Sequence, residues 1–511
     1  MKTNPYINQE KQINAIFEQR DQDWRMGGIV YQIFVDRFSP SANLEAKKSL
    51  YPSPKTLQPW SALPQRGVKD PKTKYWSHEL AFWGGDLPSA LFKVDYLSKL
   101  GINTVYLNPI FHAFSNHKYD TYDYETISPE YGTLADLKAL IETLSKEKIK
   151  LVLDGVFNHM AIASPKFLDA SNPQSPIRSW FVFGEQFPTG VRLWHNAPSL
   201  PELNLDEPLV RAYLFSGPQS IIKRYLKMGV AGWRLDTAIE LGYHYLHELT
   251  TAAHEVNPQS LVIGELNNYP QGWAPAMDAT MLIPLRDLII QTVQGNIFPE
   301  VFSKNVEQMV METGIETMLK SWVLLENHDF GRIASMLPKW SMYQLAKILQ
   351  FTLPGTVNLY MGEEIGTPGM DDPLNRAPMR WDVVENGNSY LNLHQQLIHL
   401  RQQERALRIG DIKFLHSRHL IAYLRTTNKV EETLVIIVNP SEKPVKETIL
   451  VTDGMLKSHN PFVDLLTGKT MSTSYGILLP IEIPGKTSWI LKPNLAPING
   501  YSPYKYIKGR F

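Results

Sequence analysis

Short apolar runs alternate with longer amphipathic segments through most of this 511-residue chain. Eight of the runs are bounded by Gly, Pro, Asn or Asp, which is typical of strands buried on both faces. They occupy residues 28–34, 104–108, 150–156, 232–235, 261–265, 281–283, 322–325 and 356–360. Segments of helical periodicity, such as 134–148 and 341–351, lie between several of them. The alternation predicts an α/β fold, a (β/α)8 barrel, and a doubly wound open sheet is the alternative that periodicity leaves open.

Two regions break this rhythm. Residues 159–205 are rich in Pro, Ser, Asn and aromatics, and a connection of that length is usually functional or a small subdomain. After residue 408, short runs separated by turn residues predict an antiparallel β-sandwich. The expected organisation is an N-terminal extension (1–27), a barrel (28–158 and 206–408), an insertion after its third strand (159–205) and a C-terminal β-sandwich (409–511).

Composition excludes several classes of function. The 51 Lys and Arg balance the 51 Asp and Glu, so no charge excess favours nucleic acid or an anionic membrane as a partner. The chain has no Cys, which excludes disulfides, zinc thiolate clusters and cysteine nucleophiles. The N-terminus lacks an apolar signal segment, and no later stretch is long and apolar enough to span a bilayer. We therefore expect a cytoplasmic protein without nucleic-acid or membrane partners.

Acidic residues stand at the ends of four predicted strands, where a β/α barrel carries its chemistry. They are Asp154, Asp236, Glu265 and the pair Glu326 and Asp329. Any single one is better explained as a helix cap or a surface group. Four strand ends with acids are harder to explain in that way, because charges near a barrel core cost free energy unless something pairs or uses them.

The spacing of two of these acids indicates a reaction. Asp236 and Glu265 are one strand–helix–strand step apart, so they should lie on neighbouring strands facing one pocket. Arg234, two residues before Asp236, should project to the same side and hold that carboxylate ionised by lowering its pKa. Glu265, in less cationic surroundings, would keep its proton. Such a pair performs retaining glycoside hydrolysis through a covalent glycosyl-enzyme, with Asp329 as a third group on the substrate hydroxyls.

Four segments carry a family resemblance. DGVFNH, GWRLDTAIE, VIGELN and LLENHD resemble, in order and spacing, the conserved regions of the α-amylase family of retaining glycoside hydrolases. The resemblance implies that Asp236 is the nucleophile, Glu265 the general acid/base and Asp329 the transition-state stabiliser. It also implies that 159–205 is the family's domain B and the tail its domain C.

Further matches concern the substrate. Three positions hold the sugar at the cleavage point in the family: His159, Arg234 and His328. Tyr119, in SNHKYDT, matches the stacking aromatic beneath that sugar. Asp372 and Arg376, in DPLNR, match a pair that binds the adjoining sugar on the non-reducing side.

YQIFVDRF, FWGGDL and MGEEIGTPGMDDPLNRAPMRWD are most similar to the neopullulanase, cyclomaltodextrinase and maltogenic amylase group. Glu240 matches that group's Val-Ala-Asn-Glu pattern, but Ile239 replaces the Asn. Residues 266–268 read Leu-Asn-Asn where the group commonly has a Trp. These departures suggest altered binding of the leaving group. The alternative is neutral sequence change at the rim of a pocket that tolerates substitution. The chain leaves no room before residue 28 for the N-terminal β-domain common in the group.

The resemblance implies hydrolysis of α-glucosidic bonds in cyclomaltodextrins, maltooligosaccharides or related α-glucans. An exo-acting α-glucosidase or an α-glucan transferase of the same family is the first alternative, and an inactive binding protein is the second. The expected partner is an α-glucan oligosaccharide, and the oligomeric state is left open.

We expect no required cofactor. Related enzymes often bind calcium through an Asn/Asp-rich loop after the first strand and a Gly-Gly-Asp turn. This chain keeps Gly84 and Asp86 but reads SPSANLEAKK in the loop, with few of the six to eight oxygen donors that calcium takes. Asn158 resembles another calcium ligand of the family, so the metal content stays open.

Overall fold

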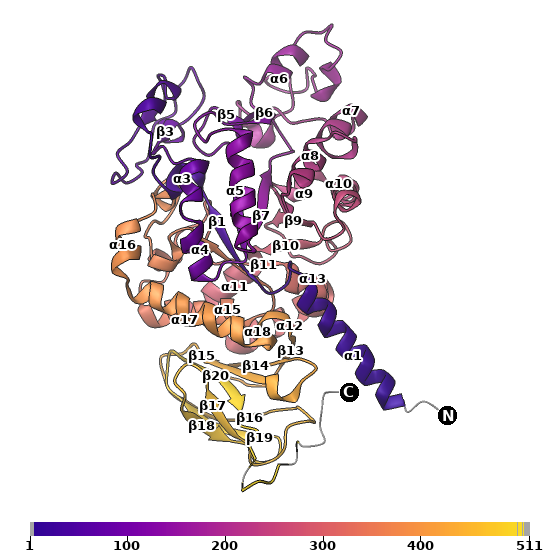
Figure 1. Ribbon diagram of the computed structural model, residues 1–511, viewed down its shortest axis with the longest axis vertical. Helices are drawn as coiled ribbons and strands as arrows, with labels where there is room; N and C mark the ends of the chain where they lie inside the picture. The colour runs from indigo at the N-terminus through magenta and orange to yellow at the C-terminus, as the bar shows by residue number, and fades with distance from the viewer. Residues whose placement is uncertain (1–4, 498, 503, 505–511) are drawn as a thin grey trace.

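Eight parallel strands close into a barrel (Figure 1) in the computed structural model, which describes residues 5–497, 499–502 and 504. Their order around the barrel is β1-β12-β11-β10-β9-β8-β7-β4. The strands are β1 (Ile29–Ile33), β4 (Thr104–Leu107), β7 (Lys150–Gly155), β8 (Gly232–Leu235), β9 (Leu261–Leu266), β10 (Ala279–Leu282), β11 (Trp322–Val323) and β12 (Thr356–Tyr360). The predicted (β/α)8 barrel is confirmed, and the open doubly wound sheet is excluded.

Side chains of alternate strand residues fill the barrel and cover its outside. Val30, Tyr106, Val152, Ile263 and Trp322 belong to one buried cluster, while the residues flanking them in the strands pack with the surrounding helices. Both faces of every strand are therefore buried, which is why the strands read as continuous apolar runs rather than alternating ones.

Helices surround the barrel. The larger ones are α4 (Val94–Leu100), α5 (Leu134–Lys146), α8 (Ile221–Met228), α10 (Tyr243–Val256), α11 (Ile283–Gln294), α12 (Pro299–Thr313), α15 (Trp340–Thr352) and α17 (Ser389–Gln403). The periodicity at 134–148 and 341–351 corresponds to α5 and α15, so both helices were predicted correctly. A capping box between Thr133 and Asp136 starts α5. None of the helices in the described ranges is long and apolar enough to cross a membrane.

The segment between β7 and α8 stands at the carboxyl ends of the strands, together with the hairpin of β5 (Phe111–Ala113) and β6 (Thr121–Ile127) (Figure 1). It contains the short helices α6 (Pro165–Ala170) and α7 (Pro208–Arg211), a few single helical turns and irregular chain between them. Isolated bridges join His159, just after β7, to Glu202, and Phe181 to Leu203, so the start and the middle of the segment are both paired with residues 202–203.

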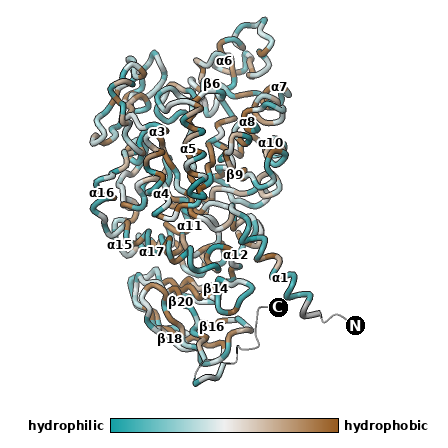
Figure 2. The backbone as a smooth tube through the Cα atoms, in the orientation of Figure 1, coloured by the Kyte–Doolittle hydropathy of each residue, from teal (hydrophilic) through white to brown (hydrophobic). Residues whose placement is uncertain are grey.

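The C-terminal part is all-β and lies at the opposite end of the barrel (Figure 1). A six-stranded sheet has the order β13-β14-β15-β20-β17-β18, and β16 pairs with β19 in a second sheet. The strands are β13 (Asp411–Phe414), β14 (Ile421–Thr426), β15 (Leu434–Asn439), β16 (Val445–Leu450), β17 (Pro461–Asp464), β18 (Thr470–Thr473), β19 (Leu478–Ile483) and β20 (Thr487–Pro493). Apolar positions gather inside the barrel and along β20 (Figure 2), and the predicted antiparallel architecture is confirmed.

The expected N-terminal extension contains one long helix, α1 (Pro5–Gln22), which contacts α18 (Arg405–Ile409). Its anchor is Arg20, which is almost fully buried. The guanidinium donates to Glu316 of the barrel at 2.7 Å and to Asp411 at the start of β13 at 2.8 Å. One side chain therefore ties α1 to both the barrel and the C-terminal sheet.

Replacing this anchor should lower the stability of the whole chain. Arg20→Met should reduce the free energy of unfolding by about 1–2 kcal/mol, because its half-exposed carboxylate partners are only partly desolvated. Lys99→Met, which removes an exposed pair with Asp95, is the matched control and should cost at most about 0.5 kcal/mol. Urea denaturation measures both, and equal effects of the two substitutions would contradict the anchoring role of α1.

Candidate active site

Three neighbouring strands bring the predicted carboxylates together. In the register of β7 and β8, Asp154 lies opposite Arg234. Trp233 and Leu235 pack with the outer core, so Arg234, between them in β8, projects into the barrel. Asp236 directly follows β8, and Glu265 lies near the end of β9. The expectation that Asp236 and Glu265 face one pocket from adjacent strands is met.

The Arg234 guanidinium is the centre of this cluster. Its Nη1 donates to Asp154 Oδ1 at 2.8 Å and to Asp236 Oδ1 at 3.1 Å. Its Nη2 lies 2.9 Å from Glu265 Oε1. The side chains of Arg234 and Asp154 have no solvent exposure. One positive charge is therefore shared among three buried carboxyl groups.

This sharing overturns the expected electrostatics of Asp236. Burial raises the pKa of Asp236 well above its ordinary value, and the charges of Glu265 and Asp154 add to that effect although Arg234 opposes it. Arg234 does lower the pKa of Asp236, as predicted, but burial and the two neighbouring carboxyls outweigh it, so the expected net lowering of this pKa is wrong. Glu265 is also not in less cationic surroundings, but burial raises its pKa. The cluster consequently holds a proton to higher pH than separate carboxyls would.

Asp154 anchors the cluster from below. The hydroxyls of Tyr106 and Tyr119 both donate to Asp154 Oδ2, the latter at 2.9 Å. Both Asp154 oxygens also accept from Arg234. Asp154 has no solvent exposure and is not among the residues that line the cavity, so it positions Arg234 rather than contacting a ligand.

A stacked pair of rings forms one wall of the site. The Tyr119 and His328 rings are parallel to within 3°, with centroids 5.2 Å apart. Gln32 Nε2 lies 3.0 Å from His328 Nδ1.

Burial, with the nearby Arg376, lowers the pKa of His328 well below its usual range, and burial lowers the pKa of His159 to about 4. Both imidazoles are therefore neutral at physiological pH and can exchange hydrogen bonds with an uncharged ligand.

Asp329 lies at the rim, with 41% of its side chain exposed. Its carboxylate contacts His328 Nε2 at 3.2 Å and Arg376 Nη2 at 3.3 Å. Arg376 Nη1 also contacts Asp372 at 3.2 Å. Arg376 therefore links Asp329 to Asp372 along one edge of the site. Glu326 is not part of it, because that carboxylate is buried against Arg332 and caps α14 (Ile333–Met336).

A cavity of about 420 Å³ connects these groups. Eight predicted site residues line it: Tyr119, His159, Asp236, Glu265, His328, Asp329, Asp372 and Arg376. Arg234 lies beneath its floor. Glu240 is outside the lining, at the rim, where its Oε1 is 2.9 Å from His195 Nε2.

The lining residues that were not singled out from the sequence include Glu79, His117, Trp194 and Phe330. His117 stands two residues before Tyr119, so the SNHKYD motif carried a signal for it. Glu79 comes close to His117 Nε2, at 3.5 Å, only through the fold. Trp194 lies in the irregular segment, where periodicity says nothing about direction.

The loop that follows β1 does not fit a calcium ion. Lys47 Nζ donates to Asp86 Oδ2 at 2.8 Å and to the Glu130 carbonyl oxygen. Lys55 and Lys118 both bind the Glu130 carboxylate. The hard oxygen donors here already hold ammonium groups. No group of three or more His, Asp or Glu in the described part of the chain could hold a metal.

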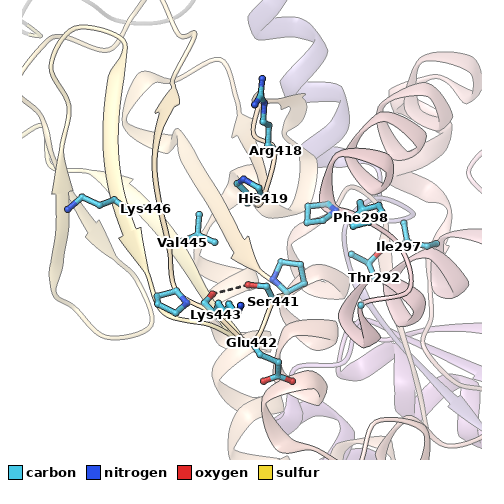
Figure 3. Close-up of a pocket in the computed structure, with 14 residues that line it drawn as sticks. Thr292, Ile297, Phe298, Arg418, His419, Ser441, Glu442, Lys443, Val445 and Lys446 are labelled. Atoms are coloured by element: carbon cyan, nitrogen blue, oxygen red, sulfur yellow. Dashed lines mark hydrogen bonds between the residues drawn. The ribbon is translucent and has the colours of Figure 1, made fainter.

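A larger groove of about 640 Å³ lies elsewhere (Figure 3), between the α11–α12 connection and the C-terminal sheets. Phe298 and Ile297 face it from the barrel, and His419 and Val445 face it from the sheets. Glu442 is the one acid among the residues that line it. The groove is near the amino ends of the barrel strands, and with a single acid it cannot supply a pair of carboxyl groups. The cavity at the carboxyl ends of the strands is therefore the candidate active site.

The chain resembles characterised proteins over nearly its whole length. It is 30% identical to neopullulanase 2 of Thermoactinomyces vulgaris over 472 residues, covering 89% of this chain and 76% of that protein. It is 32% identical to a cyclomaltodextrinase of Bacillus sp. over 448 residues, covering 84% and 75%. The solved cyclic α-maltosyl-(1→6)-maltose hydrolase of Arthrobacter globiformis superposes with a TM-score of 0.77 at 25% identity, over 92% of this chain and 99% of that one.

The family profile of the α-amylase catalytic domain matches residues 32–408. That range runs from β1 to α18 and contains every residue of the cavity lining. With its eight-stranded barrel and its relatives in the neopullulanase and cyclomaltodextrinase group, the chain belongs to the α-amylase family of glycoside hydrolases.

Proposed function

We propose that this protein hydrolyses α-glucosidic bonds in cyclomaltodextrins, maltooligosaccharides or related α-glucans with retention of configuration. One observation carries the proposal: Asp236 and Glu265 bind the two terminal nitrogens of the same guanidinium. That arrangement favours the short carboxyl separation of retaining enzymes, about 5–5.5 Å, over the wider one that admits a water in inverting enzymes. The names of the relatives, neopullulanase and cyclomaltodextrinase, support the substrate class.

In the first step the sugar at the cleavage point lies against the Tyr119 ring, with His159 and His328 hydrogen-bonding its hydroxyls. Glu265 gives its proton to the glycosidic oxygen, and the bond from that oxygen to the anomeric carbon breaks. An Asp236 oxygen bonds to the same carbon and forms a glycosyl ester. Asp329 interacts with the distorted ring as positive charge develops on it.

In the second step a water replaces the leaving group. Glu265, now a carboxylate, takes a proton from the water as the oxygen of that water attacks the anomeric carbon. The ester bond to Asp236 breaks, and its electron pair returns to the carboxylate. The Thr237 N–H donates to Glu265 Oε2 at 3.1 Å, which keeps the acid/base group oriented through both steps.

The first prediction from this mechanism concerns Asp236. The wild type should open β-cyclodextrin and cleave maltotriose, and NMR of the earliest product should show the α-anomer. Asp236→Asn should lower both rates on the order of 10³-fold or more, because an amide cannot form the glycosyl ester. Asp95→Asn, an exposed acid on α4, is the control and should leave both rates unchanged.

Two outcomes would contradict the proposal. Undiminished turnover by Asp236→Asn, in a protein of native circular dichroism, would exclude it as nucleophile. An intact β-cyclodextrin with only glucose released from maltotriose would replace the proposal by an exo-acting α-glucosidase. Longer oligosaccharides formed from maltotriose would indicate a transferase.

A second prediction concerns pH. Activity is lost at low pH when Asp236 gains a proton, and at high pH when Glu265 loses one. Since burial raises both pKa values, each limb of the kcat/KM profile should lie above the ordinary 3.8 of Asp and 4.5 of Glu. Glu265→Gln assayed on α-maltosyl fluoride, which needs little acid assistance, should lose the high-pH limb. A low-pH limb at the ordinary Asp value would contradict the shared-charge description.

We also propose that the reaction needs no calcium at the β1 loop, because the Lys47 ammonium occupies the oxygen donors there. Incubation with EDTA should leave the melting temperature and kcat unchanged. Lys47→Met should lower the free energy of unfolding by about 1–3 kcal/mol, since it leaves buried Asp86 without its cation, and added calcium should not restore it. Loss of activity in EDTA that calcium reverses would overturn the proposal.

A cytoplasmic location remains a prediction from the sequence.

A further inference from the structure

The stretch directly after the general acid brings no aromatic ring to the cavity. In the Leu-Asn-Asn stretch after the general acid, Leu266 is buried in the core, and Asn267 lines the cavity without a ring. Ile239 stands near the rim in place of the usual Asn. If nothing compensates, a sugar leaving on this side has few apolar contacts.

Trp194 supplies a ring to the same cavity from a different part of the chain. It lines the cavity together with Glu265 and Asn267. Its indole stacks on the His159 imidazole, with ring centroids 5.1 Å apart and planes inclined by 26°. A ring held against a buried side chain in this way is preorganised and loses little freedom when a ligand binds.

Backbone hydrogen bonds hold Trp194 in this position. Trp194 N–H donates to the Leu200 carbonyl at 3.0 Å, and the adjoining Leu193 bridges to Pro201. Pro201 in turn accepts from Met160 N–H at 3.1 Å, just after β7. The turn that carries Trp194 is therefore fastened to the strand end that carries His159.

The next residue shows on which side of the scissile bond the indole lies. His195 has a φ of 43°, a conformation uncommon for a residue other than glycine, and its Nε2 is 2.9 Å from Glu240 Oε1. Glu240 belongs to α9 (Ala238–Leu241), which follows Asp236 and Thr237, the donor to Glu265. Asp372 is joined through Arg376 to Asp329, whereas Trp194 is joined through His195 and Glu240 to the segment that binds Glu265. Trp194 is thus on the side of the acid.

The indole is suited to stacking rather than to hydrogen bonding. Its Nε1 is shielded from solvent and has no hydrogen-bond partner among the residues that the structure describes. A ligand in the cavity therefore meets ring carbons rather than the N–H. Glucose presents C–H groups on its ring faces, and an aromatic face is the usual protein surface for them.

We propose that Trp194 is a specificity-determining residue that forms the stacking surface for the glucosyl unit on the leaving-group side of the scissile bond. The inference rests on the proposed α-glucan hydrolysis. Within that reaction, Trp194 takes the place of the ring missing after the acid, and the His195–Glu240 contact positions it.

Two substrates separate this role from the chemistry. β-Cyclodextrin places sugars on both sides of the cleavage point, whereas α-maltosyl fluoride has no leaving-group sugar. Trp194→Ala should lower kcat/KM for β-cyclodextrin about 10- to 100-fold and change that for the fluoride less than about twofold. Trp194→Phe should recover most of the loss. Phe298→Ala, which removes a 77% exposed ring in the groove of Figure 3, is the matched control and should change neither value.

Wild-type turnover of the fluoride tests the proposed function, and the ratio of the two losses tests Trp194. Equal losses on both substrates would overturn the inference, because Trp194 would then act through His159 on the donor sugar. No loss on either substrate would overturn it as well.

A readout independent of turnover comes from the Asp236→Asn background. There, calorimetry should show at least about tenfold weaker binding of β-cyclodextrin when Trp194 is Ala, and unchanged affinity would refute the role.

Discussion

The site depends on how one guanidinium divides its charge among three carboxyl groups. Arg234 reaches Asp154, Asp236 and Glu265 at once, and its contacts with Asp154 and Glu265 exist only because β7, β8 and β9 are adjacent and in register. Removing Arg234 would leave these buried carboxyls without a cation, which costs far more than the ion pairs themselves contribute. The pairing of the barrel strands and the charge distribution in the site therefore depend on each other.

Because Asp236 and Glu265 share one guanidinium, the protonation state of each depends on that of the other. The proposed mechanism needs Asp236 ionised and Glu265 protonated, yet burial favours the protonated form of both. Ionising one raises the pKa of the other through their mutual repulsion, so the proton that leaves Asp236 makes the proton on Glu265 harder to lose. The two states required for catalysis are thus produced by coupling rather than by separate environments.

Periodicity and motif order predicted the barrel and the residues on its strand ends, because strand direction follows locally from the chain. Arg234, Asp236 and Glu265 were placed correctly for that reason. The pKa of Asp236 was predicted in the wrong direction, since the sequence shows that Arg234 is near but not how deeply Asp236 is buried, nor that Glu265 and Asp154 lie beside it. Trp194 was missed because an irregular segment has no period from which side-chain direction can be deduced. The Lys47 contact was missed because a loop lysine is ordinarily solvated.

The zero formal net charge conceals an uneven distribution. Around Glu130, three ammonium groups face two carboxylates, whereas around Arg234 one guanidinium faces three carboxyls. The first cluster is cationic, so its loop is held without an added positive ion. The second has an acidic excess, which a proton reduces. A neutral glucan gains nothing from long-range steering, so balance over the whole chain is no disadvantage. The local excess of carboxyl groups around Arg234 favours a bound proton, which is the proton that the proposed mechanism transfers.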